Sequence, residues 1–156
     1  MTAQEMERLI YNGREVSMAS EPLATYLSNL KVKPRFSPRS SGCWRGYVGT
    51  WEIKDDKLYL IDLECGIVNI AENKYLKAGL DFFFPDKKEV LAEWYSGEIR
   101  IPLGDMLEYV HGGYESSFEK DIFLEFKNGL LIRKRTVDNI LEAAKELINK
   151  GKRDCT

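Results

Sequence analysis

Two acidic residues and the single histidine are the side chains whose types and spacing best fit acid–base chemistry. Asp62 and Glu64 are two residues apart in a segment with strand character, so both point to one side of that strand. Paired carboxylates near an arginine, here Arg45, can take unlike pKa values and divide the roles of acid and base. The same residues can equally form an ion pair that seals the end of an apolar face.

The histidine, His111, precedes two glycines at the predicted end of a strand. Imidazole titrates near neutral pH, which fits a general base or a switch. A strand-end histidine that bonds a neighbouring carbonyl beside a glycine turn is the structural alternative. If the chain is an enzyme, we expect Asp62, Glu64 and His111 to be its catalytic residues and to converge on one pocket.

Common cofactor and nucleophile signatures are absent from the chain. G-x-G-x-x-G, the P-loop, H-E-x-x-H and G-x-S-x-G do not occur. The three cysteines, Cys43, Cys65 and Cys155, are widely spaced and odd in number, which indicates neither a zinc ribbon nor a disulfide framework. We therefore expect no cofactor, no metal ligands, and reduced thiols in the cytoplasm.

The segment from Lys31 to Tyr47 is basic and aromatic. From Lys31 to Trp51 the chain carries a charge of +5 with no acidic residue, which leaves −7 on the remainder. Such asymmetry can mark a binding surface, and the prolines, serines and glycines of the segment predict a loop. The expected contact residues are Arg35, Arg39, Trp44, Arg45 and Tyr47.

Three uses of this loop remain open. Arginine and tryptophan suit recognition of an acidic protein surface, and basic residues between aromatic ones suit single-stranded nucleic acid. The third possibility is a solvated loop whose charges only offset the acidic remainder. A pI near 5.6 argues against nucleic acid, for which a basic domain is expected.

Length and composition favour one globular domain. The chain has 156 residues, of which 44% are hydrophobic, and we place a single domain at 1–151 and a flexible tail at 152–156. No apolar run approaches the ~18–20 residues of a membrane helix, and the first residues lack the pattern of a signal peptide. We therefore expect a cytoplasmic protein without a membrane partner; its oligomeric state is not predicted.

Period-two patterns and turn residues predict four hairpins. Their turns are Asn12-Gly13, Asp55-Asp56, Ser96-Gly97 and Lys127–Gly129. In the second hairpin Ile53 faces Leu58 and Trp51 faces Leu60, which gives one apolar face, shared by Asp62 and Glu64.

The other two long hairpins each have an alternative. Around Ser96-Gly97, Trp94 would oppose Ile99, although a helix beginning at Asp86 is the competing interpretation. In the last hairpin a three-residue loop pairs Phe126 with Leu130, a better register than a two-residue loop provides.

Helices are few. Glu21 to Leu30 carries an early proline and apolar residues at helical spacing. Val137 to Lys150 carries an apolar stripe, with Asp138 or Thr136 as its N-cap and Gly151 as its stop. The predicted fold is α+β, a mainly antiparallel curved sheet that could be barrel-like, with a short N-terminal helix and a C-terminal helix.

Several strings together resemble a group of small uncharacterised bacterial proteins over roughly residues 9–140. The quoted stretches are Arg45–Tyr47, Trp51–Ile53, Leu58–Leu60, Trp94–Pro102, Tyr109–His111 and Phe123–Gly129. The resemblance implies a bacterial, single-domain protein and carries over no activity and no site residues.

The leading expectation is a non-enzymatic protein-binding module, an inhibitor or immunity-type partner of a bacterial toxin. Its contact surface would be the aromatic-basic loop, or equally the acidic remainder against a basic toxin. The alternative is a small-molecule-binding or hydrolytic enzyme with a carboxylate/histidine pocket in the curved sheet. Single-stranded nucleic-acid binding by the loop is a weaker third hypothesis.

Overall fold

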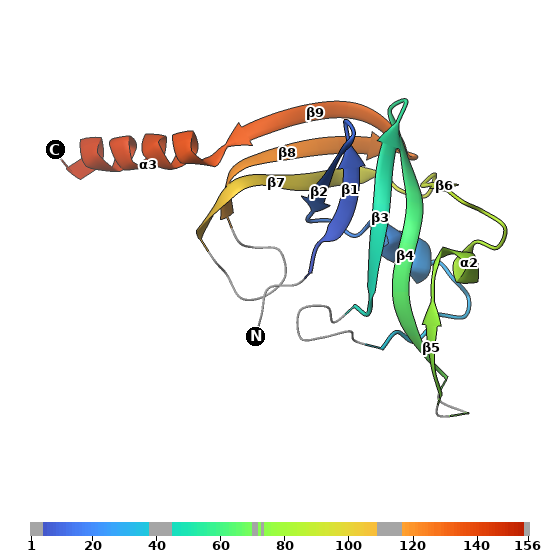
Figure 1. Cartoon of the computed structure of the whole chain (residues 1–156). Coiled ribbons are helices and arrows are strands. Elements are labelled where there is room, and N and C mark those ends of the chain that lie inside the picture. Colours follow the sequence, from blue (N-terminus) through green and yellow to red (C-terminus); the bar gives the residue numbers. More distant parts are fainter. Residues whose placement is uncertain (1–4, 38–44, 70–71, 73, 109–116, 155–156) are drawn as a thin grey trace.

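The structure, a computed structural model, describes residues 5–37, 45–69, 72, 74–108 and 117–154. Within them the chain forms an α+β fold with one large sheet and few helices (Figure 1). In chain order the elements are β1 (Glu7–Tyr11), β2 (Arg14–Met18), α1 (Pro22–Ser28), β3 (Tyr47–Lys54), β4 (Lys57–Asn69), β5 (Lys74–Ala78), α2 (Leu80–Phe83), β6 (Val90–Leu91), β7 (Gly97–Glu108), β8 (Ser117–Lys127), β9 (Leu130–Asp138) and α3 (Asn139–Asp154).

The sheet runs in the order β2-β1-β3-β4-β9-β8-β7, with β5 and β6 also paired to β4. It consists of two arms, β2-β1-β3-β4 and β9-β8-β7, and these pair at a single position, Lys57 with Leu130. The arms curve toward each other without closing into a barrel (Figure 1). The predicted curved α+β sheet is confirmed, although β1 and β3 pair in parallel, which was not expected.

Two of the predicted hairpins form with the expected register. Tyr11 pairs with Arg14 around Asn12-Gly13, whose positive φ angles of 52° and 77° suit a tight hairpin turn. Around Asp55-Asp56, Ile53 faces Leu58 and Trp51 faces Leu60, as the apolar pattern requires. These turns are local features, so their residues alone determine them.

The hairpin predicted around Ser96-Gly97 is wrong. Val90 and Leu91 pair with β4 instead, and β7 pairs with β8, placing Ile99 opposite Leu124. The competing helix from Asp86 does not form either, because Val90 and Leu91 are extended as β6. The pairing of Val90 and Leu91 with β4 buries the same apolar face that the predicted hairpin would have buried. The alternation of apolar and polar residues is therefore compatible with both arrangements and could not show which one forms.

The last hairpin has the two-residue turn Asn128-Gly129, not the predicted three-residue loop. Lys127 pairs with Leu130 and Phe126 pairs with Leu131, after which the register shifts. The shift leaves Ile132 as an extra residue on β9, so that Glu125 faces Arg133. The predicted three-residue loop is wrong because a β-bulge on β9, rather than the length of the turn, sets the register of the strands beyond it.

Both predicted helices form, but the second runs further than expected. Helix α1 has Pro22 in its first turn, and Trp94 Nε1 donates to the Pro22 carbonyl at 2.9 Å. In α3, Asp138 is the N-cap, since its Oδ1 accepts from the amides of Ile140 and Leu141 at 3.1 Å. The helix continues to Asp154, so Gly151 is not its end.

Helix α3 projects from the end of β9, away from the body of the sheet (Figure 1). Its first residue, Asn139, donates to Asp121 Oδ2 at 2.7 Å and to the carbonyl of Phe118 at 2.8 Å. Four large apolar side chains along the helix are exposed: Ile140, Leu141, Leu147 and Ile148. Among the described residues, no helix is long and apolar enough to cross a membrane.

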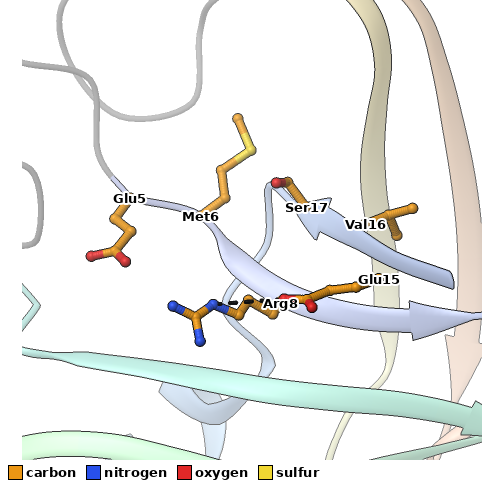
Figure 2. Close-up of a pocket in the computed structure, with 6 residues that line it drawn as sticks. All are labelled: Glu5, Met6, Arg8, Glu15, Val16 and Ser17. Atoms are coloured by element: carbon orange, nitrogen blue, oxygen red, sulfur yellow. Dashed lines mark ion pairs between the residues drawn. The ribbon is translucent and has the colours of Figure 1, made fainter.

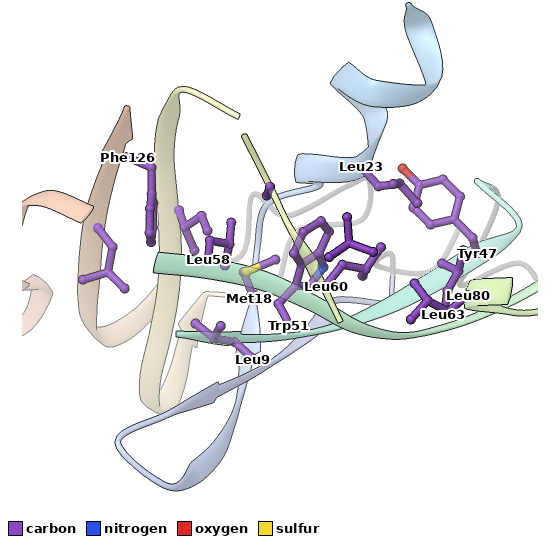
Figure 3. Close-up of a cluster of buried hydrophobic side chains, with 14 of the residues drawn as sticks. Leu9, Met18, Leu23, Tyr47, Trp51, Leu58, Leu60, Leu63, Leu80 and Phe126 are labelled. Atoms are coloured by element: carbon purple, nitrogen blue, oxygen red, sulfur yellow. The ribbon is translucent and has the colours of Figure 1, made fainter. Parts of the chain in front are cut away.

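One hydrophobic core lies between the two arms. Trp51, Leu60 and Ile99 are fully buried in it, and Trp94 packs against it from one side. Figure 3 shows Met18 of the β1–β2 hairpin beside Trp51, Leu9 below them, and Phe126 at the opposite end of the cluster from Tyr47. Trp51, Leu60, Trp94 and Ile99 therefore belong to one apolar cluster, although the predicted pairing of Trp94 with Ile99 does not form.

Candidate protein-binding surface

The two carboxylates proposed for catalysis do not face the core. A register shift between Thr50 and Trp51 leaves Ile61 as an extra residue on β4, so Thr50 faces Asp62 while Trp51 still faces Leu60. The bulge turns Leu63 inward, and it turns Asp62 and Glu64 outward, where both are exposed. The expectation that they share the Trp51 face is therefore wrong.

Three further predicted site residues lie outside the described residues: His111, Arg39 and Trp44. The remaining predicted contacts are Arg35, Arg45 and Tyr47. Tyr47 is 4% exposed and packs in the core, and the Arg45 side chain is 11% exposed. Of these three, only Arg35 has an exposed side chain.

Arg45 forms a buried ion pair that sequence reasoning missed. Its Nη2 atom lies 2.8 Å from Glu7 Oε2, and the Glu7 side chain is fully buried. Glu7 Oε2 also accepts from the Gly49 amide at 2.6 Å. Arg45 Nη1 donates to the carbonyl of Glu5 at 2.7 Å. The pair ties the start of β1 to the start of β3.

Gly49 makes the space in which Glu7 is held. A Cβ at this position would lie 2.9 Å from both Glu7 Oε1 and Trp51 Nε1. Burial raises the pKa of the Glu7 carboxyl above its ordinary value of 4.5, against the opposing attraction of Arg45. Two features hid this pair in the sequence. Glu7 and Arg45 are 38 residues apart. Glu7 also lies on the same core-facing side of β1 as Leu9, where the alternation of a strand predicts an apolar residue.

The outer part of the basic segment runs along β4. The amide of Ser37 donates to the Gly66 carbonyl at 2.9 Å, and the Val68 amide donates to the Arg35 carbonyl at 2.8 Å. Between them Phe36 turns inward, with its ring 5.2 Å from that of Tyr47. Residues 35–37 are thus held like a short strand, which leaves the side chain of Arg35 on the surface.

A shallow apolar pocket of about 470 Å³ lies beside this anchored stretch. Its lining residues are Leu30, Val32, Lys33, Pro34, Arg35, Ile67, Val68, Phe82 and Phe83. Val32 is 86% exposed and Phe82 49%, high values for apolar side chains that meet at one place. In the part of the chain that the structure describes, the side chains of Lys33 and Arg35 have no ion-pair partner. We call these nine residues the basic–apolar surface.

A second pocket, on the outer side of the β1–β2 hairpin, differs in kind (Figure 2). It is lined mainly by polar side chains, and an ion pair of 3.9 Å between Arg8 and Glu15 crosses it. Its opposite charges are already paired and it offers little apolar area, so it lacks the features that attract a charged partner.

The described residues contain no group of three or more histidine, cysteine, aspartate or glutamate side chains placed to hold a metal ion. Cys65 is buried, which raises its pKa to about 11 and keeps the thiol protonated at neutral pH. Its Sγ donates to the Ala78 carbonyl at 3.4 Å.

Comparison of the chain with protein-family models, with curated proteins and with solved structures gives no match. The function must therefore be argued from the surface itself.

Proposed function

We propose that this protein is a non-enzymatic binding module that holds another protein through the basic–apolar surface. The observation that carries the proposal is the exposure of Val32 and Phe82 beside Lys33 and Arg35, two cations that have no ion-pair partner among the described residues. Exposed apolar side chains with a charged rim are characteristic of protein interfaces, where the apolar part supplies affinity and the rim supplies selectivity.

The partner that fits is an acidic segment with one large apolar side chain. Lys33 and Arg35 would meet its carboxylates, and the apolar side chain would enter the pocket between Val32 and Phe82. The pocket is shallow and formed partly by a loop, which suits one side chain of a larger partner better than an enclosed small molecule. The remainder of the chain is acidic, so it would repel such a partner elsewhere and orient its approach.

A labelled peptide with one phenylalanine flanked by glutamates tests the proposal. We expect fluorescence polarisation to show binding that weakens at least about tenfold when Lys33→Glu and Arg35→Glu are combined. Replacing the phenylalanine of the peptide by serine should weaken binding by a similar factor, since the apolar anchor is lost.

The matched control is the double variant Lys127→Glu and Arg133→Glu, which reverses two exposed cations on the other arm of the sheet. It should leave the affinity within about twofold of the wild-type value. Equal loss in the two double variants would mean that only net charge matters, and it would reject the surface as a specific site.

In its finer form the proposal is that the partner is a bacterial toxin and that this chain is its inhibitor or immunity-type partner. Growth of cells that co-express a toxin encoded beside this gene provides the test. Wild-type protein should restore growth, and the Lys33→Glu, Arg35→Glu variant should fail to restore it while accumulating to the same level. Rescue by both proteins would reject this surface as the toxin contact.

A further inference from the structure

The seam between β2 and β7, where the two arms of the sheet meet, is open along part of its length. Near one end the strands are joined, because the Ala19 amide donates to the Arg100 carbonyl at 2.8 Å and the Arg100 amide donates to Ser20 Oγ at 3.2 Å. Within the described residues β2 pairs only with β1, and no ladder continues from this junction.

Pro102 explains why the seam opens at this point. Alternate residues of a strand direct their amides to the same edge, so Pro102 follows Arg100 on the edge of β7 that faces β2. Proline has no N–H to donate, and such residues are found at sheet edges. Gly104, the next position on that edge, has a φ of 82°, and β7 departs from its regular register after Leu103.

The open part of the seam contains a pocket of about 400 Å³. Its lining residues are Tyr11, Asn12, Arg14, Val16, Ile101, Leu103 and Ile122. Ile101 belongs to the buried core, and Val16, Leu103 and Ile122 pack against that core, so the apolar floor is continuous with the interior. These floor residues all lie on paired strands, which hold a binding site more rigidly than a loop does.

The rim of this pocket is positively charged. Arg14 is exposed at the mouth, and it shares a face of the hairpin with Tyr11, its cross-strand partner. Lys134 of β9 reaches toward the same place, with its Nζ 5.4 Å from the centre of the Tyr11 ring. The lining contains no acidic side chain, and Arg14 has no ion-pair partner in the described part of the chain.

We propose that this seam pocket binds a small amphipathic anion, an aliphatic carboxylate whose chain lies on Val16, Leu103 and Ile122. The carboxylate would meet Arg14 and Lys134 at the mouth, where charge-assisted hydrogen bonds can form without burying an unpaired charge. The volume is within the range of small-molecule sites, which commonly combine an apolar floor with a few polar groups. This site is separate from the basic–apolar surface and does not depend on the protein-binding proposal.

Titration with straight-chain carboxylates tests the site. We expect decanoate to shift the methyl resonances of Ile101 and Ile122 in NMR spectra, and affinity to rise roughly threefold per methylene from hexanoate to decanoate. Decyltrimethylammonium, which has the same chain and the opposite charge, should bind at least about tenfold more weakly. Equal binding of the two amphiphiles would overturn the proposal.

Charge reversal on the β1–β2 hairpin locates the anion. Arg14→Glu should weaken decanoate binding at least about fivefold, and Lys134→Gln should weaken it by a smaller factor. The matched control is Arg8→Glu, which changes the same charge on the opposite face of the hairpin and should alter affinity less than about twofold. Shifts confined to residues outside the seam, or an affinity indifferent to Arg14, would also overturn the proposal.

Discussion

The two ends of the basic segment, Lys31 to Tyr47, both carry positive charge, but the cations lie on the surface at one end and inside the protein at the other. At the first end, Lys33 and Arg35 stand on the surface beside an apolar pocket without an ion-pair partner in the described residues. At the second end, Arg45 is inside the protein, paired with the fully buried Glu7. The same basic segment therefore contains one buried structural residue, Arg45, and two candidate contact residues, Lys33 and Arg35. Arg45 differs from the other two because the carboxylate of Glu7, distant in the sequence, lies beside it in the fold.

The largest expected effect is loss of stability at the inner end. Arg45→Ala leaves Glu7 buried without its cation, which should lower the free energy of unfolding by about 3–5 kcal/mol. Urea denaturation measures it. Adding Glu7→Gln to this variant should recover part of the loss, because the uncompensated charge is removed. A loss below about 1 kcal/mol for Arg45→Ala would show that the two ends do not differ in this way.

A smaller loss of stability is expected at Gly46, which precedes Tyr47 and packs closely against Phe36 and Ser37. Its φ is 78°, and a Cβ there would lie 2.6 Å from the Ser37 carbonyl oxygen. Gly46→Ala should therefore lower the free energy of unfolding by about 1–3 kcal/mol, from backbone strain and overpacking. Gly13→Ala is a useful comparison, since its φ is 77° and a Cβ there would meet nothing within 4 Å. If thermal denaturation showed equal losses of stability for Gly46→Ala and Gly13→Ala, the loss at Gly46 would come from its positive φ alone and not from the contact with Ser37.

The pH dependence of stability distinguishes burial from ion pairing at Glu7. Burial raises its pKa in the folded state, so the folded protein keeps this proton to a higher pH than the unfolded chain does. The resulting stabilisation is complete below about pH 4.5 and is lost as the pH rises through the folded-state pKa. The stability of wild type relative to Glu7→Gln should therefore fall with rising pH, measured by urea denaturation between pH 4 and pH 7. A rising difference would mean that attraction to Arg45 outweighs burial.

The smallest effect on stability is expected at the outer end. Arg35→Ala and Val32→Ser replace exposed side chains and should change the free energy of unfolding by less than about 0.5 kcal/mol. Both should nevertheless weaken binding of the acidic peptide, so chemical denaturation and fluorescence polarisation would diverge. A stability loss comparable to that of Arg45→Ala would place Arg35 among the structural groups.

Local features of the fold were predictable because their causes lie within a few residues. Asn12-Gly13 determines its own turn, Pro22 begins α1, and Asp138 caps α3. The β-bulges at Ile61 and Ile132 were not predictable, since each isoleucine simply follows a leucine in an apolar pair and carries no residue type specific to a bulge. Each bulge reverses which side chains face the core, and the carboxylate pair was placed wrongly for that reason.

The candidate surface was predictable only in part. Charge and composition identified the basic segment and its residue Arg35, but they could not show that Arg35 is exposed whereas Arg45 is buried. The distinction requires Glu7, which the parallel pairing of β1 with β3 brings beside Gly49. The apolar half of the surface was missed because Phe82 follows Arg35 by 47 residues and lies in a helix of only four residues.

Because Ile61 is an extra residue, the alternation of inward and outward side chains in the first half of β4 does not continue in step into the second half. Deletion of Ile61 would remove the bulge and restore regular alternation, with Leu63 and Cys65 still inward and Asp62 and Glu64 still outward. The strand should therefore tolerate the loss of Ile61 better than the loss of a residue from either regular half, because the latter would exchange the inward and outward side chains of that half.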